Sequence, residues 1–247
     1  MKALKHYMDS TYLKTPEQSG LSEEQTKQKV IELCEEAIKE GFYAVMIRPE
    51  YVSFAKKFLA ERNANTKVGT VIGFHEGTYS TEHKLKEAEQ AIEDGADDLD
   101  FVVNYEAFKK GDLDLVKNEI KECTEVVLKN NRTAKWIIEA AALTDEQIAQ
   151  ITDLIREVVE GNFSGKEQFV FVKSSTGFYP TEGGKPNGAT PENIKIMTEH
   201  AGKLPVKAAG GVRSAQEARE MIAMGVTRIG TSSAKKICDG ESADAGY

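Results

Sequence analysis

Two lysines, each at the end of an apolar segment, have the surroundings needed for nucleophilic chemistry. Lys173 ends the run Phe-Val-Phe-Val-Lys and is followed by Ser-Ser-Thr-Gly, and Lys207 ends Leu-Pro-Val-Lys and is followed by Ala-Ala-Gly-Gly. A buried ammonium group is unfavourable unless it is paired or loses its proton. A lysine that is neutral near physiological pH is a nucleophile. The two segments therefore indicate Schiff-base formation with a carbonyl substrate.

The order of the segments predicts that the two lysines are neighbours. They end consecutive predicted strands, and a second positive charge together with partial burial lowers the pKa of an amine. Lys173 is then the candidate nucleophile, while Lys207 stays charged. The alternative is that both are ordinary lysines whose ammonium groups reach solvent at the rim of the fold. Two lysines on adjacent strands, each before a turn of small residues, favour the catalytic interpretation.

An acidic segment supplies the candidate for proton transfer. In Gly-Ala-Asp-Asp-Leu-Asp-Phe, strand alternation puts Asp98 and Asp100 on one face and Leu99 on the other. A carboxylate in a closed interior needs a cationic partner, and the lysines are available. Asp100 is predicted to transfer protons or to keep Lys207 charged, and a salt bridge without a role in turnover is the alternative. Asp9, at the end of the first predicted strand, has a similar interpretation.

Three turns rich in Gly, Ser and Thr form a candidate anion site. Glycines let the backbone N–H groups approach an anion closely, and hydroxyls add hydrogen-bond donors. Ordinary turn chemistry is the alternative, and the absence of a Walker A pattern gives no reason to expect a nucleoside triphosphate. The candidate phosphate-binding residues are Thr176, Gly177, Gly210, Gly211, Gly230, Ser232 and Ser233.

The elements that position these residues alternate between apolar runs and amphipathic helices. Helices after the strands begin at capping boxes and end at glycines that lead directly into the next strand. Eight strand-helix units in about 250 residues predict a (β/α)8 TIM barrel. A doubly wound open sheet is the alternative, but no G-x-G-x-x-G follows the first strand. The predicted strands are Lys5–Asp9, Tyr43–Ile47, Val68–Gly73, Asp98–Val103, Lys135–Glu139, Phe169–Lys173, Val206–Ala209 and Thr227–Gly230.

No linker or change of composition divides the chain, so we expect one α/β barrel domain over residues 1–247 with a mobile tail over 239–247. A net charge of −8 and a charged content of 29% predict a globular protein that binds neither nucleic acid nor membrane. The start of the chain lacks a signal peptide and no apolar run would span a bilayer, so we expect a cytoplasmic protein. The sequence leaves a homodimer open.

A metal centre and a disulfide framework are both disfavoured. The three cysteines are widely spaced and form no C-x-x-C pair, and the four histidines have no ligand spacing. Paired lysines also do their chemistry without help from a metal or an organic cofactor. We therefore expect no cofactor, and a phosphorylated sugar or aldehyde as substrate.

The chain resembles the deoxyribose-phosphate aldolases, a family of class I aldolases, over nearly its whole length. The two lysine motifs carry most of the resemblance, and the others support it. In the family's order, the matching segments are Met8-Asp-Ser-Thr-Tyr-Leu-Lys14, Val71-Ile-Gly-Phe74, Gly95-Ala-Asp-Asp-Leu-Asp100, Phe171-Val-Lys-Ser-Ser-Thr-Gly-Phe178, Val206-Lys-Ala-Ala-Gly-Gly-Val-Arg213 and Ile229-Gly-Thr-Ser-Ser233.

The resemblance implies a barrel that reversibly cleaves 2-deoxy-D-ribose 5-phosphate to D-glyceraldehyde 3-phosphate and acetaldehyde. It implies that Lys173 forms the Schiff base, that Lys207 perturbs its pKa, and that Asp100 and Lys207 relay protons. Some family members end in a tyrosine that reaches the active site as a proton shuttle, and Tyr247 matches that ending.

Asp9 and Thr11, in the opening segment of the resemblance, join the candidate substrate-binding residues. The chain also departs from the family's pattern at Phe74-His-Glu-Gly77, at Ala140-Ala141 and by an insertion at Tyr179–Gly188. The insertion puts substrate preference in question, so another phosphorylated sugar or ketose is the alternative within the same chemistry. A non-catalytic phosphosugar-binding barrel and, with less support, a phosphate-binding isomerase are the alternatives outside it.

Overall fold

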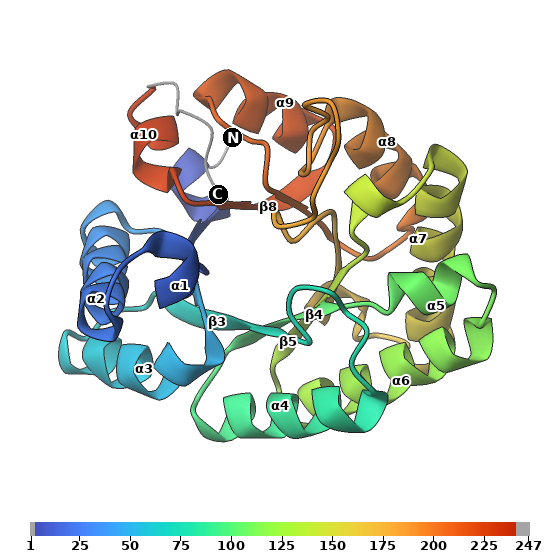
Figure 1. Ribbon diagram of the computed structural model, residues 1–247, viewed down its shortest axis with the longest axis horizontal. Coiled ribbons are helices and arrows are strands. Elements are labelled where there is room, and N and C mark those ends of the chain that lie inside the picture. The colour runs from blue at the N-terminus through green and yellow to red at the C-terminus, as the bar shows by residue number, and fades with distance from the viewer. Residues whose placement is uncertain (1–2, 241–247) are drawn as a thin grey trace.

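The computed structural model describes residues 3–240 and shows eight parallel strands that close into a barrel (Figure 1). Consecutive strands pair with each other, and β1 pairs with β8 to complete the ring. The predicted barrel is confirmed, and an open doubly wound sheet is excluded because its two edge strands would not pair. The strands are β1 (Met8–Thr11), β2 (Ala44–Ile47), β3 (Lys67–Ile72), β4 (Asp98–Val102), β5 (Thr133–Ile137), β6 (Val170–Lys173), β7 (Val206–Ala209) and β8 (Val226–Thr231).

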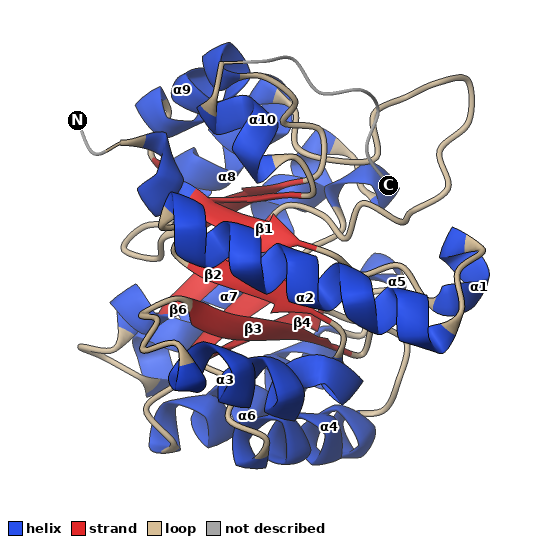
Figure 2. Cartoon of the chain, turned by 90° about the vertical axis from the view of Figure 1, so that its left-hand side faces the viewer, coloured by secondary structure: helices blue, strands red, loops and turns tan. Residues whose placement is uncertain are grey.

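Helices surround the barrel, and Figure 2 shows the strands enclosed by them. None of the helices between residues 3 and 240 has both the length and the hydropathy that a bilayer span requires. The α-helices are α1 (Pro16–Ser19), α2 (Glu23–Glu40), α3 (Val52–Glu61), α4 (Thr81–Glu93), α5 (Tyr105–Lys109), α6 (Leu113–Lys129), α7 (Asp145–Asn162), α8 (Pro191–His200), α9 (Ala215–Ala223) and α10 (Ala234–Cys238). Short 3-10 helices are η1 (Leu4–Tyr7), η2 (Pro49–Tyr51), η3 (Ala140–Ala142) and η4 (Glu167–Phe169).

The helix starts follow from side-chain caps that the sequence specifies. The predicted capping boxes form at Ser22, Thr144 and Ser214, and Thr190 caps α8 with Pro191 in its first turn. A cap of this kind stabilises a helix by about 1 kcal/mol. Each cap therefore also fixes where the loop that leaves the preceding strand must end.

The first strand begins later than the sequence predicts. Lys5 and His6 belong to the 3-10 helix η1, and the strand runs over Met8–Thr11 instead of Lys5–Asp9. Lys5 and His6 are exposed, whereas all four residues of β1 are buried, so the polar pair does not fit a strand that is covered on both sides. Asp9 is consequently the second residue of β1 and not its last.

Neighbouring strands β4 and β5 show how the barrel separates polar from apolar side chains. The Phe101 ring stacks on the Trp136 ring with 4.9 Å between centroids, and both belong to the apolar core. The residues at the alternate positions of the two strands are charged. Lys135 on β5 pairs with Asp98 and Asp100 on β4. On these two strands, alternation thus sends the aromatic rings to the helices and the charged groups to the barrel interior.

A buried ion pair outside the barrel fixes the ends of β3 and β4. The Nζ of Lys84 on α4 lies 2.5 Å from Oε1 of Glu119 on α6 and donates to the carbonyl oxygens of Gly77 and Val102, each at 2.7 Å. The second Glu119 oxygen accepts the backbone N–H of Asn104 at 2.9 Å. Every donor of the ammonium group has an acceptor, which makes the burial of this pair tolerable. The loops after both strands are therefore tied to the outer helices.

Candidate active site

Asp100 lies at the centre of a charged network inside the barrel. Its Oδ2 accepts from Nζ of Lys173 at 2.8 Å and from Nζ of Lys207 at 2.9 Å. Its Oδ1 accepts from Nζ of Lys135 at 2.9 Å. The two lysines singled out in the sequence thus meet on a single carboxylate oxygen, although 73 and 107 residues separate them from Asp100 in the chain.

The network continues toward β1 and β8. Oδ2 of Asp9 lies 2.7 Å from Nζ of Lys207, and Oδ1 of Asp9 accepts a hydrogen bond from the Arg228 guanidinium. Asp98 lies 2.7 Å from Nζ of Lys135 and 3.9 Å from the Arg228 guanidinium. All these side chains are buried, so each charge is balanced by its neighbours and not by water.

The charges of this network do not cancel when every group is ionised. Its cations outnumber its carboxylates by one, and an unbalanced buried charge is unfavourable. The imbalance favours the neutral form of one amine. Within residues 3–240, the members joined by direct ion pairs are the cations Lys135, Lys173, Lys207 and Arg228 and the carboxylates Asp9, Asp98 and Asp100.

Lys173 is the amine of this network whose pKa is lowered. Burial lowers the pKa of Lys173 to about 8; the Asp100 charge opposes this shift, and the charges of Lys207 and Lys135 reinforce it. Burial alone would raise the pKa of Asp100, but the three lysines hold it well below its usual range. Near neutral pH a useful fraction of Lys173 is therefore a free amine beside an ionised carboxylate, which is the state that attacks a carbonyl.

Two members of the network, Lys135 and Arg228, were not identified from the sequence. Both interrupt strands that are otherwise apolar on the alternate positions, in Ala-Lys-Trp on β5 and Thr-Arg-Ile on β8. The same alternation that placed Asp98 and Asp100 on one face would have placed these cations inside. The alternation of the strands therefore carries the signal for both residues, whereas the polar residues singled out in the sequence follow from the carboxyl ends of the strands.

The turn after Lys173 is held by hydrogen bonds from both sides. Ser174 Oγ donates to the carbonyl of Ala209 at 3.1 Å and accepts its N–H at 3.0 Å. Thr176 donates its hydroxyl to Oε2 of Glu139, and its own Oγ1 accepts the N–H of Phe178 at 3.0 Å. The turn therefore has few degrees of freedom, which keeps the Lys173 side chain in one position.

The candidate anion-binding turns lie together at the carboxyl ends of β6, β7 and β8. Gly210 donates its N–H to the Gly230 carbonyl at 3.3 Å, and both Gly210 and Gly211 have positive φ, 69° and 77°. A Cβ at Gly230 would lie 3.1 Å from Lys207 Cε, so a larger residue there would push the Lys207 side chain aside by a few tenths of an ångström. Ser232 is exposed and Ser233 half-buried.

Two other candidate binding residues are occupied inside the protein. Thr11 donates its hydroxyl to the Asp9 carbonyl at 2.9 Å. The Asp9 carboxylate is held by Lys207 and Arg228, so it faces the charged network. The tyrosine that the resemblance singled out, Tyr247, lies outside the described residues.

The long loop between β6 and α8 is anchored at both ends. Asn187 Nδ2 donates to the Gly177 carbonyl at 2.9 Å, and the Ala189 N–H is shared by the carbonyls of Ala209 and Gly210, both at 3.1 Å. At Gly188 a side chain would lie only 2.4 Å from the Gly210 backbone. The end of the inserted segment is thus packed directly against a candidate anion-binding turn.

One departure from the family's pattern, at His75, contacts the loop after β6 at the rim. The His75 ring, after β3, stacks on the Phe178 ring with 5.6 Å between centroids, and the Phe74 ring meets Phe178 edge-on at 5.2 Å. The Arg48 guanidinium lies 4.9 Å from the centre of the Phe74 ring. The loops after β3 and β6 therefore contact each other through aromatic rings.

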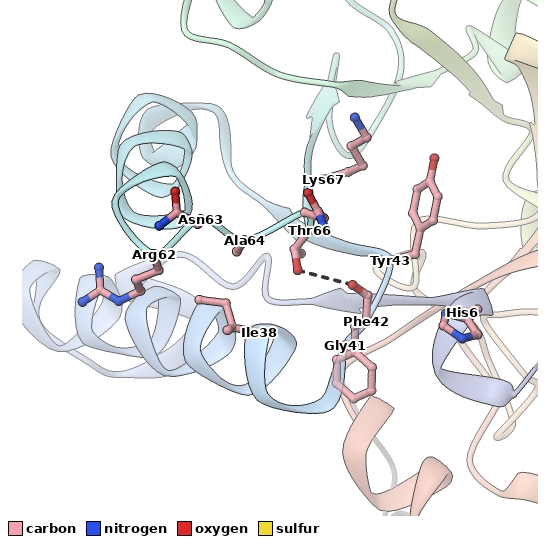
Figure 3. A pocket seen from close by; sticks show the side chains of 11 residues that line it. His6, Ile38, Gly41, Phe42, Tyr43, Arg62, Asn63, Ala64, Thr66 and Lys67 are labelled. Atoms are coloured by element: carbon pink, nitrogen blue, oxygen red, sulfur yellow. Dashed lines mark hydrogen bonds between the residues drawn. The ribbon is translucent and has the colours of Figure 1, made fainter.

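A cavity of about 490 Å³ lies at the other end of the barrel, where β2 and β3 begin (Figure 3). Tyr43 and Lys67 line it, and Thr66 Oγ1 donates to the Phe42 carbonyl across its wall at 3.4 Å. The Arg228 guanidinium lies 3.2 Å from the centre of the Tyr43 ring. Tyr43 therefore packs against the charged network from the amino ends of the strands, away from Lys173.

Residues 3–240 contain no cluster of His, Cys, Asp and Glu side chains that could hold a metal ion.

The barrel is closed and parallel, and its interior pairs two lysines with one aspartate. One of the two lysines, Lys173, is the last residue of its strand. This arrangement is that of a class I barrel aldolase. The model of the DeoC/LacD family of aldolases matches residues 6–240, and the chain belongs to that family.

Individual relatives agree with this assignment. A deoxyribose-phosphate aldolase of Thermococcus kodakarensis is 44% identical over 225 residues, 91% of this chain and 94% of the relative. A solved aldolase named QR15 is 34% identical with a TM-score of 0.79, covering 97% of this chain and 96% of its own. A tetrameric deoxyribose phosphate aldolase of Aeropyrum pernix is 28% identical with a TM-score of 0.77, covering 96% and 89%.

Removing the Lys207 charge is expected to raise the pKa of Lys173. In Lys207→Met the nearby positive charge that favours the free amine is lost, and Asp100 keeps one fewer cation. The rising limb of kcat/KM against pH should move to higher pH, and a move of one whole pH value lowers the rate at neutral pH by about tenfold. A limb that stays or moves to lower pH would contradict this expectation. Lys203→Met, an exposed lysine after α8, is the control.

Proposed function

We propose that this chain catalyses the reversible cleavage of 2-deoxy-D-ribose 5-phosphate to D-glyceraldehyde 3-phosphate and acetaldehyde through a Schiff base on Lys173. The observation that carries the proposal is the pair Lys173 and Lys207 on one oxygen of Asp100, with the pKa of Lys173 lowered to about 8. The names of relatives more than 30% identical over most of the chain support the choice of substrate.

The first half of the reaction depends on the neutral form of Lys173. Its Nζ attacks C1 of the open-chain sugar aldehyde, and loss of water with uptake of one proton from solvent gives a protonated imine on that nitrogen. The imine carries the positive charge that the ammonium form had, so the charge balance with Asp100 is restored once the covalent bond forms. The protonated imine is the electron sink for the next step.

The second half needs a base for the C3 hydroxyl and then an acid that protonates C2. The Asp100 carboxylate, acting through water and Lys207, accepts the proton of the C3 hydroxyl, and the C2–C3 bond breaks to release D-glyceraldehyde 3-phosphate. The electron pair of that bond becomes the enamine on Lys173. Protonation of the enamine at C2 and hydrolysis release acetaldehyde and return the free amine.

The phosphate end of the substrate is proposed to lie over the turns after β6, β7 and β8. These turns contain Thr176, Gly177, Gly210, Gly211, Gly230, Ser232 and Ser233. A net charge of −8 repels an anion from the surface as a whole, so the attraction must come from local N–H groups and hydroxyls. Asp9 and Thr11 contribute indirectly, because Asp9 holds Lys207 in place.

The test is the release of acetaldehyde from deoxyribose 5-phosphate by the purified chain. Turnover of this sugar and not of ketose phosphates supports the proposal, whereas the reverse preference identifies a different Schiff-base aldolase. Binding of the sugar without turnover or covalent trapping would identify a phosphosugar-binding barrel. A chain lacking Tyr247, assayed beside the full chain, tests the proposed proton shuttle, since a shuttle at the tail should lower kcat more than it changes KM.

We also propose that the chain forms a homodimer. The support is that the relative from Aeropyrum pernix is a tetramer, and tetramers with two-fold symmetry contain dimers. Light scattering after size exclusion distinguishes one copy of 27.2 kDa from two or four.

A further inference from the structure

Glu139, two residues after β5, carries a buried carboxyl group to which the proposed mechanism assigns no step. Glu139 is only 1% exposed, and its backbone φ of 55° lies in the left-handed region. The other non-glycine residues with positive φ between residues 3 and 240 are the exposed asparagines Asn63 and Asn131, a type that tolerates this conformation. Glutamate does not share that tolerance, so its contacts must hold Glu139 there.

The contacts of Glu139 all lead to the turn that carries Lys173. The N–H of Thr176 lies 3.4 and 3.3 Å from the two carboxylate oxygens, and the Thr176 hydroxyl donates to Oε2. The backbone on either side of Glu139 also reaches this turn, through Ile138 N–H to the Lys173 carbonyl at 3.0 Å and Ala140 N–H to the Ser174 carbonyl at 2.9 Å. The carboxylate and its flanking peptides thus bind the segment directly after the nucleophile.

The charge of Glu139 is sensitive to its surroundings. Burial raises the pKa of Glu139 to about 7, while the Thr176 hydrogen bonds and the Lys173 charge act in the opposite direction. Tyr105 of α5 faces the same carboxyl group, and burial together with Glu139 raises the pKa of Tyr105 to about 12, so Tyr105 stays neutral. Glu106, Tyr179 and Glu76 act on Tyr105 from farther out. Lys173 is therefore the neighbour whose charge changes during turnover.

We propose that Glu139 is a positioning residue for Lys173, which in its ionised form holds Thr176 and favours the cationic Schiff base. The inference rests on the proposed function. An ionised carboxylate accepts both the N–H and the hydroxyl of Thr176, whereas a protonated one loses an acceptor site. The imine on Lys173 reacts in its protonated, positively charged form, and a carboxylate nearby stabilises that charge relative to the free amine.

The test is the pH dependence of kcat/KM in Glu139→Gln. Glutamine has the same shape and keeps an acceptor for Thr176, but it does not ionise. In the wild type, kcat/KM should rise with two ionisations, Glu139 near pH 7 and Lys173 near pH 8. In the variant only the Lys173 ionisation is expected, moved to lower pH because an anionic neighbour is gone, with the plateau lowered by about ten- to a hundredfold.

The matched control is Glu167→Gln, the same change at a buried glutamate at the amino end of β6. It should keep the wild-type pH profile. An unchanged profile in Glu139→Gln would overturn the inference and leave the proposed function intact, whereas a wild type that releases no acetaldehyde would overturn the function itself. Thermal melts of both variants show whether each is folded.

A second variant tests the route through Thr176. In Thr176→Val the hydroxyl hydrogen bond that lowers the pKa of Glu139 is lost, so the lower of the two ionisations should move to higher pH. The losses in Glu139→Gln and Thr176→Val should not add in the double variant, since the two residues act as one unit. Fully additive losses would show that Glu139 does not act through Thr176. If Glu139→Gln fails to fold, the shift in Thr176→Val decides the question.

Discussion

Replacing Lys173 with alanine is expected to abolish covalent trapping of the substrate and nearly all turnover. Borohydride reduces a Schiff base to a stable secondary amine, so wild-type protein mixed with deoxyribose 5-phosphate should gain the mass of the reduced adduct on one lysine. In Lys173→Ala no adduct should form, and kcat should fall by at least about ten-thousandfold, as for other enzymes that lose their nucleophile.

The prediction is specific because the other interior lysines are held by carboxylates. Lys135 is paired with both Asp98 and Asp100, and Lys207 with both Asp9 and Asp100, whereas Asp100 is the one carboxylate paired with Lys173 among the described residues. Lys195→Ala, at an exposed position on α8, should trap like the wild type. Full trapping in Lys173→Ala would show that another lysine is the nucleophile.

Replacing Asp100 with asparagine is expected to separate Schiff-base formation from carbon-carbon cleavage. The Asp100 charge raises the pKa of Lys173, so its loss should lower that pKa and leave more free amine. Trapping by borohydride should persist, moved to lower pH. Cleavage should fall by about a hundred- to ten-thousandfold because the route for the C3 hydroxyl proton is lost. Burst measurements of imine formation against steady-state acetaldehyde release distinguish the two steps.

The same substitution should destabilise the barrel. Asp100 is in contact with three buried lysines, and removing one partner of a buried ion pair costs about 3 to 5 kcal/mol. Asp97→Asn is the matched control, since Asp97 binds Lys56 at the amino end of the same strand. That control should lose stability but keep its turnover and pH profile. Equal losses of kcat in both variants would mean that Asp100 acts only through stability.

The barrel and its central charges were accessible from the sequence because they follow periodic rules. Capping boxes and helix-ending glycines located the repeated units, and alternation put Asp98 and Asp100 on one face. Lys173 and Lys207 lie on strands adjacent in both chain and barrel, so their proximity could be inferred without coordinates.

The rest depends on contacts that span the ring. Asp9 and Arg228 meet because β1 closes on β8, a pairing between the two ends of the chain that no local pattern encodes. Lys135 is harder to recognise because it lies before the carboxyl end of its strand, whereas the active site of a barrel is expected at the carboxyl ends. The contact of Glu139 with Thr176 needs a left-handed backbone at a glutamate, which the sequence alone gives no reason to expect.

The anchored loop between β6 and α8 has a consequence for how this protein could change over time. Asn187 and Ala189 fasten its returning end to the turns after β6 and β7, so residues added or removed between Tyr179 and Lys185 leave those contacts in place. Doubling the length of a flexible loop costs only about 0.6 kcal/mol in closure entropy. The rim can therefore acquire a new shape, and with it a preference for different acceptor aldehydes, through insertions and deletions that never disturb the amine and carboxylates below.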